Sequence, residues 1–322
     1  MPGPFVHSID PILFGIGDLQ LWWYGLSYTL GFLGVALYLR RHRARLGLSL
    51  DEVYLLGTLL AGGVLLGGRL VEVCFYEWPH YSRHLHHIPA VWLGGMSTHG
   101  ILLGAVLGTW IFCRRTGRSF LDVADALAIP GAYVMGMGRI GNFIDGQIVG
   151  ALTDVPWAVQ FPDAEGFRHP VVLYDGLKNL LLIPLLVALR NRAPARGVLL
   201  GTFLLGYGLP RVFIDLFREY RTALWGFPPG QELNLLMSLP GLALILRGRL
   251  RPTLTCSTPQ LAPLPPSRVP HRILFTVLVL LPTIIPSDWT QDVPWRYGAR
   301  HPGLEHSALY PELPELRTQS NE

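Results

Sequence analysis

The stretch LWWYGLSYTLGFLGVALYL, residues 21–39, decides the fold, because it is 19 residues long and carries no charged side chain. A helix needs about 20 apolar residues to cross the hydrocarbon core of a bilayer. The stretch begins with Trp22, Trp23 and Tyr24, side chains that favour the membrane surface, and the basic run RRHRAR at residues 40–45 follows it. It therefore predicts a transmembrane helix.

The composition of the whole chain is typical of a protein that crosses the membrane several times. Half of its 322 residues are hydrophobic and only 15% are charged. Lys178 is the only lysine, so the net charge of +4 comes from arginines that are scattered between apolar segments. This scatter argues against nucleic-acid binding, which uses basic side chains gathered on one face. The expected surroundings are the lipid bilayer.

Six further apolar segments follow the first, at residues 53–73, 90–113, 123–137, 171–189, 198–214 and 233–246. Together they predict an all-α polytopic membrane protein with about seven transmembrane helices. Basic clusters follow every second segment, at residues 40–45, 114–118, 190–196 and 247–251. The positive-inside rule makes these clusters cytoplasmic. The N-terminus is then outside, together with residues 76–90, 139–170 and 218–230.

Three regions are expected along the chain. Residues 1–251 form a membrane-embedded domain, residues 252–272 a Pro- and Ser-rich linker, and residues 273–322 a tail. The tail opens with an eighth apolar segment, residues 273–285, which Pro282 interrupts. Its length is marginal for crossing a bilayer.

The most unusual polar stretch is GMGRIGNFIDGQIVG, residues 136–150, which contains Arg139, Asn142 and Asp145 among five glycines. An arginine at the centre of a bilayer costs roughly 2.5–3.5 kcal/mol on insertion scales, so its presence indicates a ligand or reaction site. Glycines let the backbone approach a ligand closely. We interpret Arg139 with Asn142 as an anion clamp; a cap on a helix terminus is the alternative.

Two other places could contribute to such a site. Arg211 and Asp215 stand four residues apart, so they share one helix face. They are either an ion pair that fixes the helix or part of a phosphate site, which the planar fork of arginine suits. His99, within GGMSTHG at residues 94–100, is either a structural histidine or a group that takes up a proton near neutral pH.

Four histidines, at positions 80, 84, 86 and 87, resemble a metal-binding pattern. No ordered pair of carboxylates or cysteines accompanies them, so a solvated outer loop is the favoured interpretation and no metal site is expected.

The chain resembles the bacterial prolipoprotein diacylglyceryl transferases from about residue 14 to residue 246. The resemblance rests on five motifs in order: WYGL at 23–26, GGMSTHG at 94–100, GRIGNFI at 138–144, RHP at 168–170 with LY at 173–174, and GYG at 206–208 with Arg211. It implies that phosphatidylglycerol donates its diacylglyceryl group to the lipobox cysteine of a preprolipoprotein, forming a thioether and releasing glycerol phosphate. It also implies a multi-pass enzyme of the bacterial cytoplasmic (inner) membrane, with its active site toward the outer face and no cofactor.

The resemblance also implies roles for particular residues. The expected catalytic residues are Tyr24, His99, Arg139 and Arg211, and the expected substrate-binding residues are Arg139, Asn142, Asp145, Gln147, Gly150, Arg211 and Asp215. Arginines would stabilise the charge that develops on the departing phosphate. A thiol with a pKa of about 8.5 is little ionised at pH 7, so a base such as His99 would help it to react.

The chain departs from the family pattern at several positions. The family usually has Asn-Gly-Glu where this chain has Asp145-Gly146-Gln147, Gln where Val172 stands, and Glu where Asp175 and Asp215 stand. Asp145 is the candidate to supply the charge that Gln147 lacks. Two alternatives stay open: a lipid-binding protein of the same fold without turnover, and a small-anion transporter lined by Arg139 and Arg211. A transporter should show an internal repeat of its spans, and none is seen in residues 1–250.

Overall fold

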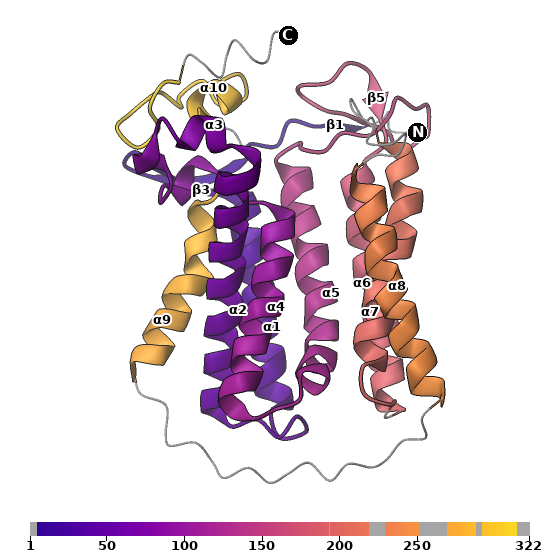
Figure 1. Ribbon diagram of the computed structural model, residues 1–322. Helices are drawn as coiled ribbons and strands as arrows, with labels where there is room; N and C mark the ends of the chain where they lie inside the picture. Colours follow the sequence, from indigo (N-terminus) through magenta and orange to yellow (C-terminus); the bar gives the residue numbers. More distant parts are fainter. Residues whose placement is uncertain (1–4, 193, 219–228, 251–268, 288–291, 314–322) are drawn as a thin grey trace.

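The computed structural model describes residues 5–192, 194–218, 229–250, 269–287 and 292–313, and it shows a bundle of long helices beneath a small head (Figure 1). The long helices are α1 (Trp23–His42), α2 (Leu50–Val71), α4 (Thr98–Thr116), α5 (Phe120–Ile144), α6 (Val171–Asn191), α7 (Val198–Ile214) and α8 (Pro229–Leu250). Each overlaps one predicted apolar segment, so the mostly helical architecture is confirmed. Within the described residues, four helical stretches are long and apolar enough to cross a membrane: Leu50–Tyr76, Phe120–Ile144, Val171–Asn191 and Val198–Phe217.

Two helices differ from their predicted bounds near the polar motifs. Helix α4 starts at Thr98 rather than at residue 90, because Gly94 and Gly95 have φ values of 84° and 81° and interrupt the helix. Helix α5 continues to Ile144 rather than ending at residue 137. Arg139 and Asn142 therefore lie on the last turns of a helix, and the predicted end of this span at residue 137 was wrong by seven residues.

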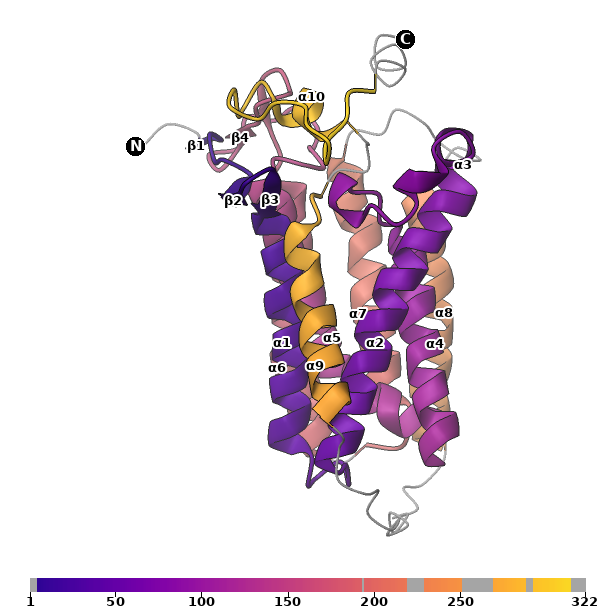
Figure 2. The ribbon, with the colours of Figure 1, turned by 90° about the vertical axis from the view of Figure 1, so that its left-hand side faces the viewer.

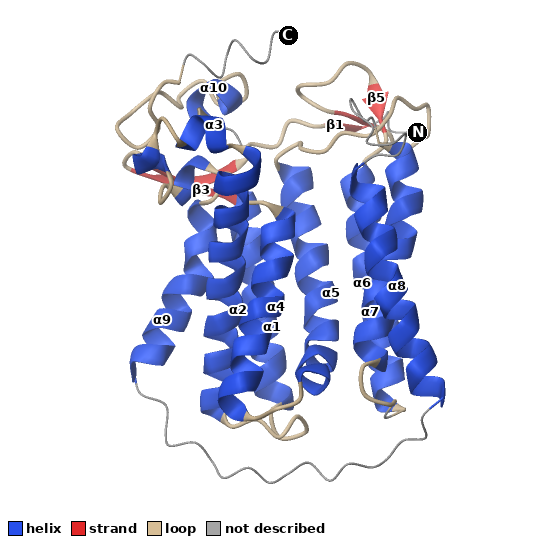
Figure 3. Cartoon of the chain, viewed as in Figure 1, coloured by secondary structure: helices blue, strands red, loops and turns tan. Residues whose placement is uncertain are grey.

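The head contains short strands that an all-α prediction missed (Figure 3). The strands β1 (Phe5–Val6), β4 (Val159–Gln160) and β5 (Phe167–Arg168) form one sheet, in which β1 is parallel and β5 antiparallel to β4. The hairpin of β2 (Ile12–Ile16) and β3 (Leu19–Trp22) forms the second. Short helical turns complete the described head and the helix ends: η1 (Glu72–Tyr76), α3 (Trp78–Tyr81), η2 (Leu85–His87), η3 (Val91–Leu93) and η4 (Asp215–Phe217).

Helices α2 and α4 pack with their backbones in contact. A Cβ atom on Gly63 would meet the main-chain oxygen of Gly104, and a Cβ on Gly67 would meet that of Gly100. Glycines spaced four residues apart allow this close approach between membrane helices. The packing fixes the first turn of α4, which carries His99.

The C-terminal segment packs against the bundle and the head. It consists of α9 (Val269–Leu280), η5 (Leu281–Ile284) and α10 (Val293–Tyr297). Helix α9 runs beside α1 and α2 (Figure 2), where the Thr29 hydroxyl donates to the Val279 carbonyl at 3.0 Å. The stretch His271–Ile284 is apolar but shorter than the four long spans. Of the predicted linker, residues 252–268 lie outside the described residues and the remainder begins α9.

Residues 292–313 contribute several side chains to the core of the head. The buried residues of this core are Trp22, Ala90, Leu93, Val293, Tyr297, Leu304 and Tyr310. The ring centroids of Trp22 and Tyr297 lie 4.8 Å apart. The N-terminal hairpin, the segment before α4 and the tail thus share one small core.

The basic helix ends gather at the end of the bundle opposite the head. Helices α1, α4, α6 and α8 all finish there (Figure 1), and each has arginine in its last turn. The alternation of basic loops that the sequence predicts is therefore reproduced in space.

Candidate active site

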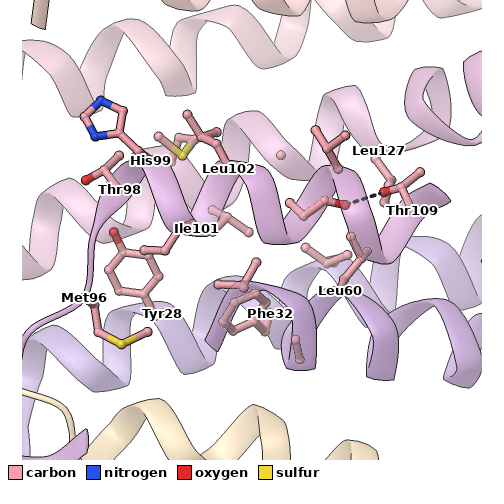
Figure 4. Close-up of a pocket in the computed structure, with 18 of the residues that line it drawn as sticks. Tyr28, Phe32, Leu60, Met96, Thr98, His99, Ile101, Leu102, Thr109 and Leu127 are labelled. Atoms are coloured by element: carbon pink, nitrogen blue, oxygen red, sulfur yellow. Dashed lines mark hydrogen bonds between the residues drawn. The ribbon is translucent and has the colours of Figure 1, made fainter. Parts of the chain in front are cut away.

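A cavity of about 740 Å³ opens between α1, α2, α4, α5 and α7. Most of its lining is apolar, including Phe32, Leu60, Leu102, Leu127 and Phe203. Its polar lining residues include Tyr24, Tyr28, Glu72, Tyr76, His99, Arg139, Asn142, Gln147 and Ser287. Thr98 and His99 lie at the first turn of α4, with Thr109 and Leu127 far along the cavity (Figure 4). A long apolar cavity with a few polar groups suits a lipid with a polar head.

Arg139 faces this cavity from α5 and is held by Asp175 of α6. The Arg139 Nε lies 2.5 Å from Asp175 Oδ2, and Arg139 Nη1 donates to Asn142 Oδ1 at 3.1 Å. Asp175 is fully buried and also pairs with Arg211 Nη1 and, at 3.1 Å, with Lys178 Nζ. One carboxylate therefore orients three cations.

A second buried carboxylate, Asp215, extends this network. Its Oδ1 lies 3.1 Å from Arg211 Nε and 3.6 Å from Arg218 Nη1. We call Arg139, Asp175, Lys178, Arg211, Asp215 and Arg218 the cationic cluster. Of these, Arg139, Lys178 and Arg211 face only the two carboxylates of Asp175 and Asp215 in the ion pairs of the described chain, so positive charge exceeds negative charge here. A buried charge is costly unless it is paired, so the cluster favours a bound anion.

The glycines around Arg139 explain how α5 brings it to this place. A Cβ on Gly138 would meet the Tyr28 ring, and a Cβ on Gly141 would lie 2.9 Å from the Tyr24 Cα. A different face of α5, which carries Arg139, packs against α6: a Cβ on Gly176 of α6 would lie 3.1 Å from the Arg139 Cβ. The sequence GRIGN thus packs α5 tightly against α1 with its glycines and directs its arginine toward α6.

His99 lies at the polar part of the cavity and is positioned by Tyr76. The Tyr76 hydroxyl and His99 Nδ1 are 2.7 Å apart, and their rings are stacked with centroids 6.2 Å apart. Tyr76 ends a π-helical turn, a feature frequent at functional sites. Tyr76 is the hydrogen-bond partner of His99 within the described residues, so Nε2 is available to a substrate.

Gln147 lines the cavity, whereas Asp145 lies behind the wall. Asp145 is 0% exposed, and its Oδ2 accepts from the Ser287 amide at 3.3 Å and from the Tyr297 hydroxyl at 3.5 Å. Ile148, the next residue along the wall, has a φ of 60°. A β-branched residue rarely adopts such a φ, and strain of this kind tends to occur at functional sites.

Gly150, Arg211 and Asp215 also stand behind the cavity wall. Gly150 pairs with Arg218 in a β-bridge, and its carbonyl accepts from Arg168 Nη1 at 3.2 Å. Gly150 therefore joins the loop after α5 to the end of α7. Among the expected site residues, those that line the cavity are Tyr24, His99, Arg139, Asn142 and Gln147.

Sequence reasoning did not assign Asp175 and Lys178 to the site. The signal was present, because they are two charged residues three positions apart inside the predicted span 171–189. Arg69 and Glu72 gave the same signal in the span 53–73. Arg69 is buried and donates to main-chain oxygens before α4, including those of His87 and Ile88 at 2.6 and 2.8 Å.

Comparison with known proteins agrees with this geometry. A sequence-family profile described as "Prolipoprotein diacylglyceryl transferase" matches residues 11–247. The phosphatidylglycerol-prolipoprotein diacylglyceryl transferase of Geobacter sulfurreducens is 41% identical over 248 residues, which cover 74% of this chain and 95% of that protein. The protein of the same name from Legionella pneumophila is 37% identical over 245 residues (73% and 95%), and that from Photorhabdus laumondii 38% over 271 residues (74% and 92%). The resemblance predicted from the motifs is confirmed, and the chain belongs to the prolipoprotein diacylglyceryl transferase family.

Proposed function

We propose that this chain transfers the diacylglyceryl group of phosphatidylglycerol to the lipobox cysteine thiol of preprolipoproteins. The observation that carries the proposal is the position of Arg139. This arginine belongs to the cationic cluster, which has excess positive charge, and it also lines a long apolar cavity. The relatives are named for this transfer. An enzyme that acts on a phospholipid needs these two features side by side.

The lipid would bind with its acyl chains in the apolar part of the cavity and its phosphate near Arg139. The Arg139 side chain is already oriented by Asp175 and Asn142, so little reorganisation is needed when the phosphate arrives. Gln147 lies on the same wall and offers an uncharged amide to the head group.

In the reaction, the cysteine sulfur attacks the carbon of the diacylglyceryl group that is bonded to the phosphate ester oxygen. The S–C bond forms while the C–O bond breaks, and the electron pair of that bond stays on the departing glycerol phosphate. Arg139 stabilises this developing charge, with Arg211 acting behind it through the shared Asp175. His99 Nε2 accepts the thiol proton, while Tyr76 holds the ring at Nδ1.

The proposed topology has about seven spans, with the N-terminus and the head outside a bacterial cytoplasmic membrane. The arginines at the ends of α1, α4, α6 and α8 support it, because the cytoplasmic side of a membrane protein is enriched in such residues. The active site then faces outward, where α5 and α4 meet the head.

The test is complementation of a bacterial strain depleted of its own transferase. Mass spectrometry of a model lipoprotein should show a diacylglyceryl mass on its lipobox cysteine when this chain is expressed. If the purified chain retains phosphatidylglycerol but no modified lipoprotein forms, the protein is a lipid binder and the proposed transfer is wrong. Reporter fusions at the two ends of the bundle test the orientation.

A further inference from the structure

The head contains a group of four histidines that the proposed reaction does not use. His80 lies on α3, and His84, His86 and His87 lie on and beside η2, between α2 and the glycine motif before α4. We call these four residues the outer-loop histidine cluster. The structure gathers their rings: potential ligand atoms of His84, His86 and His87 all lie within 4.8 Å of one another. His87 Nδ1 and His80 Nε2 are 3.3 Å apart.

These distances can be compared with those in a metal site. With metal–nitrogen bonds of about 2.0–2.1 Å, two nitrogens on one tetrahedral ion lie roughly 3.4 Å apart. The His80 and His87 nitrogens, which share a hydrogen bond, are already 3.3 Å apart, and the ligand atoms of His84, His86 and His87 would have to move from within 4.8 Å of one another to this closer spacing. The ring centroids of His84 and His86 lie 5.3 and 4.2 Å from that of His87 and 6.1 Å from each other, so the three rings are mutual neighbours.

The backbone beneath the cluster is held in place. Arg69 of α2 donates to the carbonyl oxygen of the buried His87 at 2.6 Å and to that of Ile88 at 2.8 Å. Within the loop, the His87 amide donates to the His84 carbonyl at 2.9 Å, and the His84 amide to the His80 carbonyl at 3.1 Å. A fixed backbone lowers the entropy lost when side chains close around an ion.

We propose that the outer-loop histidine cluster binds one zinc ion. Imidazole nitrogens suit zinc, and His84, His86 and His87 would supply three of the four ligands of a tetrahedral ion, with water or the adjacent His80 as the fourth. The sequence alone favoured a solvated loop, because it showed no carboxylate or cysteine partners. The structure instead gathers three imidazoles, with a fourth hydrogen-bonded to one of them. Since the same loop leads into residues 94–100, the ion would hold the outer wall of the cavity without entering the reaction.

The test is zinc binding by the full-length protein, purified in detergent with any polyhistidine tag removed. Isothermal titration with zinc chloride and metal analysis after dialysis should both give about one ion per chain. The melting temperature should rise by a few degrees when zinc is added, because a ligand that binds only the folded state stabilises it. Replacing two exposed or half-buried members of the cluster, His84→Asn with His86→Asn, should weaken binding at least tenfold.

The matched control removes two histidines elsewhere, His42→Asn with His271→Asn, and should bind zinc as the wild type does. The melting temperature of each variant in a chelator reports whether it is folded. The proposal is overturned if the wild type binds no zinc at micromolar concentration, if the His84 and His86 variant binds as tightly as the wild type, or if the control loses binding equally.

Discussion

Arg300 donates from its Nη1 to the main-chain oxygen of Asp145 at 2.5 Å, joining two residues that are 155 positions apart. Asp145 directly follows α5 and leads into Gln147 and Ile148 on the cavity wall. Arg300 lies beyond residues 11–247, the part of the chain that matches the family. The C-terminal segment of this protein therefore supports the turn that follows the Arg139 motif.

If Arg300 positions this turn, its removal should slow transfer without disrupting the bundle. We expect Arg300→Met to lower kcat roughly tenfold, because a small misplacement of positioned groups slows a reaction considerably. Arg300→Lys keeps a donor and should retain most of the activity. Rates of lipid transfer to a lipobox peptide, with KM for phosphatidylglycerol, measure the effect.

The matched control is His301→Asn, since His301 contacts Asp10 of the head at 3.0 Å rather than Asp145. Equal loss of rate in the control and in Arg300→Met would show that the tail acts only by stabilising the head.

The order of helices could be predicted because each apolar run is long enough to be recognised by itself. The span 198–214 coincides with α7 at both ends. The start of α4 was missed, because it depends on the left-handed conformations of Gly94 and Gly95, which composition does not reveal. The short strands of the head were missed for a similar reason: β1 pairs with β4, more than 150 positions away.

Part of the candidate site could be predicted from the sequence, and part of it depends on contacts between distant segments. Arg139 and His99 drew attention because polar groups are rare in apolar spans. The role of Asp175 could not be predicted, because it requires knowing that α5, α6 and α7 lie side by side. The contact of Asp145 with Tyr297 of the tail depends on the same kind of long-range information.

Arg139 and Arg211 should respond differently to substitution. Arg139 lines the cavity, and without it Asp175 still pairs with Arg211 and Lys178. We therefore expect Arg139→Ala to accumulate in the membrane but to lose transfer by roughly 100-fold or more. Arg139→Lys should rescue poorly, because lysine lacks the planar fork.

Arg211→Ala should lose transfer and also stability. It leaves Asp215 with only the longer Arg218 pair among those described, and breaking a buried ion pair costs about 3–5 kcal/mol. Melting in detergent and transfer rates, measured on both arginine variants, separate the two effects. Normal turnover in either variant removes that arginine from the mechanism.

The proposed base, His99, makes a prediction about pH. His99→Gln keeps a hydrogen-bonding side chain but cannot accept a proton, so transfer should fall roughly 100-fold near pH 7. The defect should shrink as pH rises past about 8.5, where the cysteine thiol ionises without help. Tyr76→Phe, which loses only the 2.7 Å bond to Nδ1, should have a smaller effect. An unchanged pH profile in His99→Gln would make His99 structural.

Two adjacent glycines of α2 offer a direct test of the packing against α4. A Cβ on Gly63 would meet the Gly104 backbone, whereas a Cβ on Gly62 would meet only the Leu278 side chain, at 3.7 Å. Gly63→Ala should therefore destabilise the protein by about 1–3 kcal/mol. Gly62→Ala should be neutral or stabilising by up to about 1 kcal/mol, as alanine is the better helix former. Melting temperatures that shift alike in both variants contradict the packing.

The last prediction concerns Asp145, whose carboxylate was expected to replace the charge that Gln147 lacks. The geometry favours another role, because Asp145 is fully buried and its Oδ2 accepts from the Ser287 amide and the Tyr297 hydroxyl. An asparagine oxygen can accept both bonds, so Asp145→Asn should keep the transfer rate within about threefold. Asp145→Leu should lower the transfer rate roughly tenfold and lower the melting temperature, because it removes the acceptor of the buried Tyr297 hydroxyl and of the Ser287 amide. Inactivation by Asp145→Asn, with recovery when Gln147→Glu is added, would show instead that the site needs the negative charge itself and that either position can provide it.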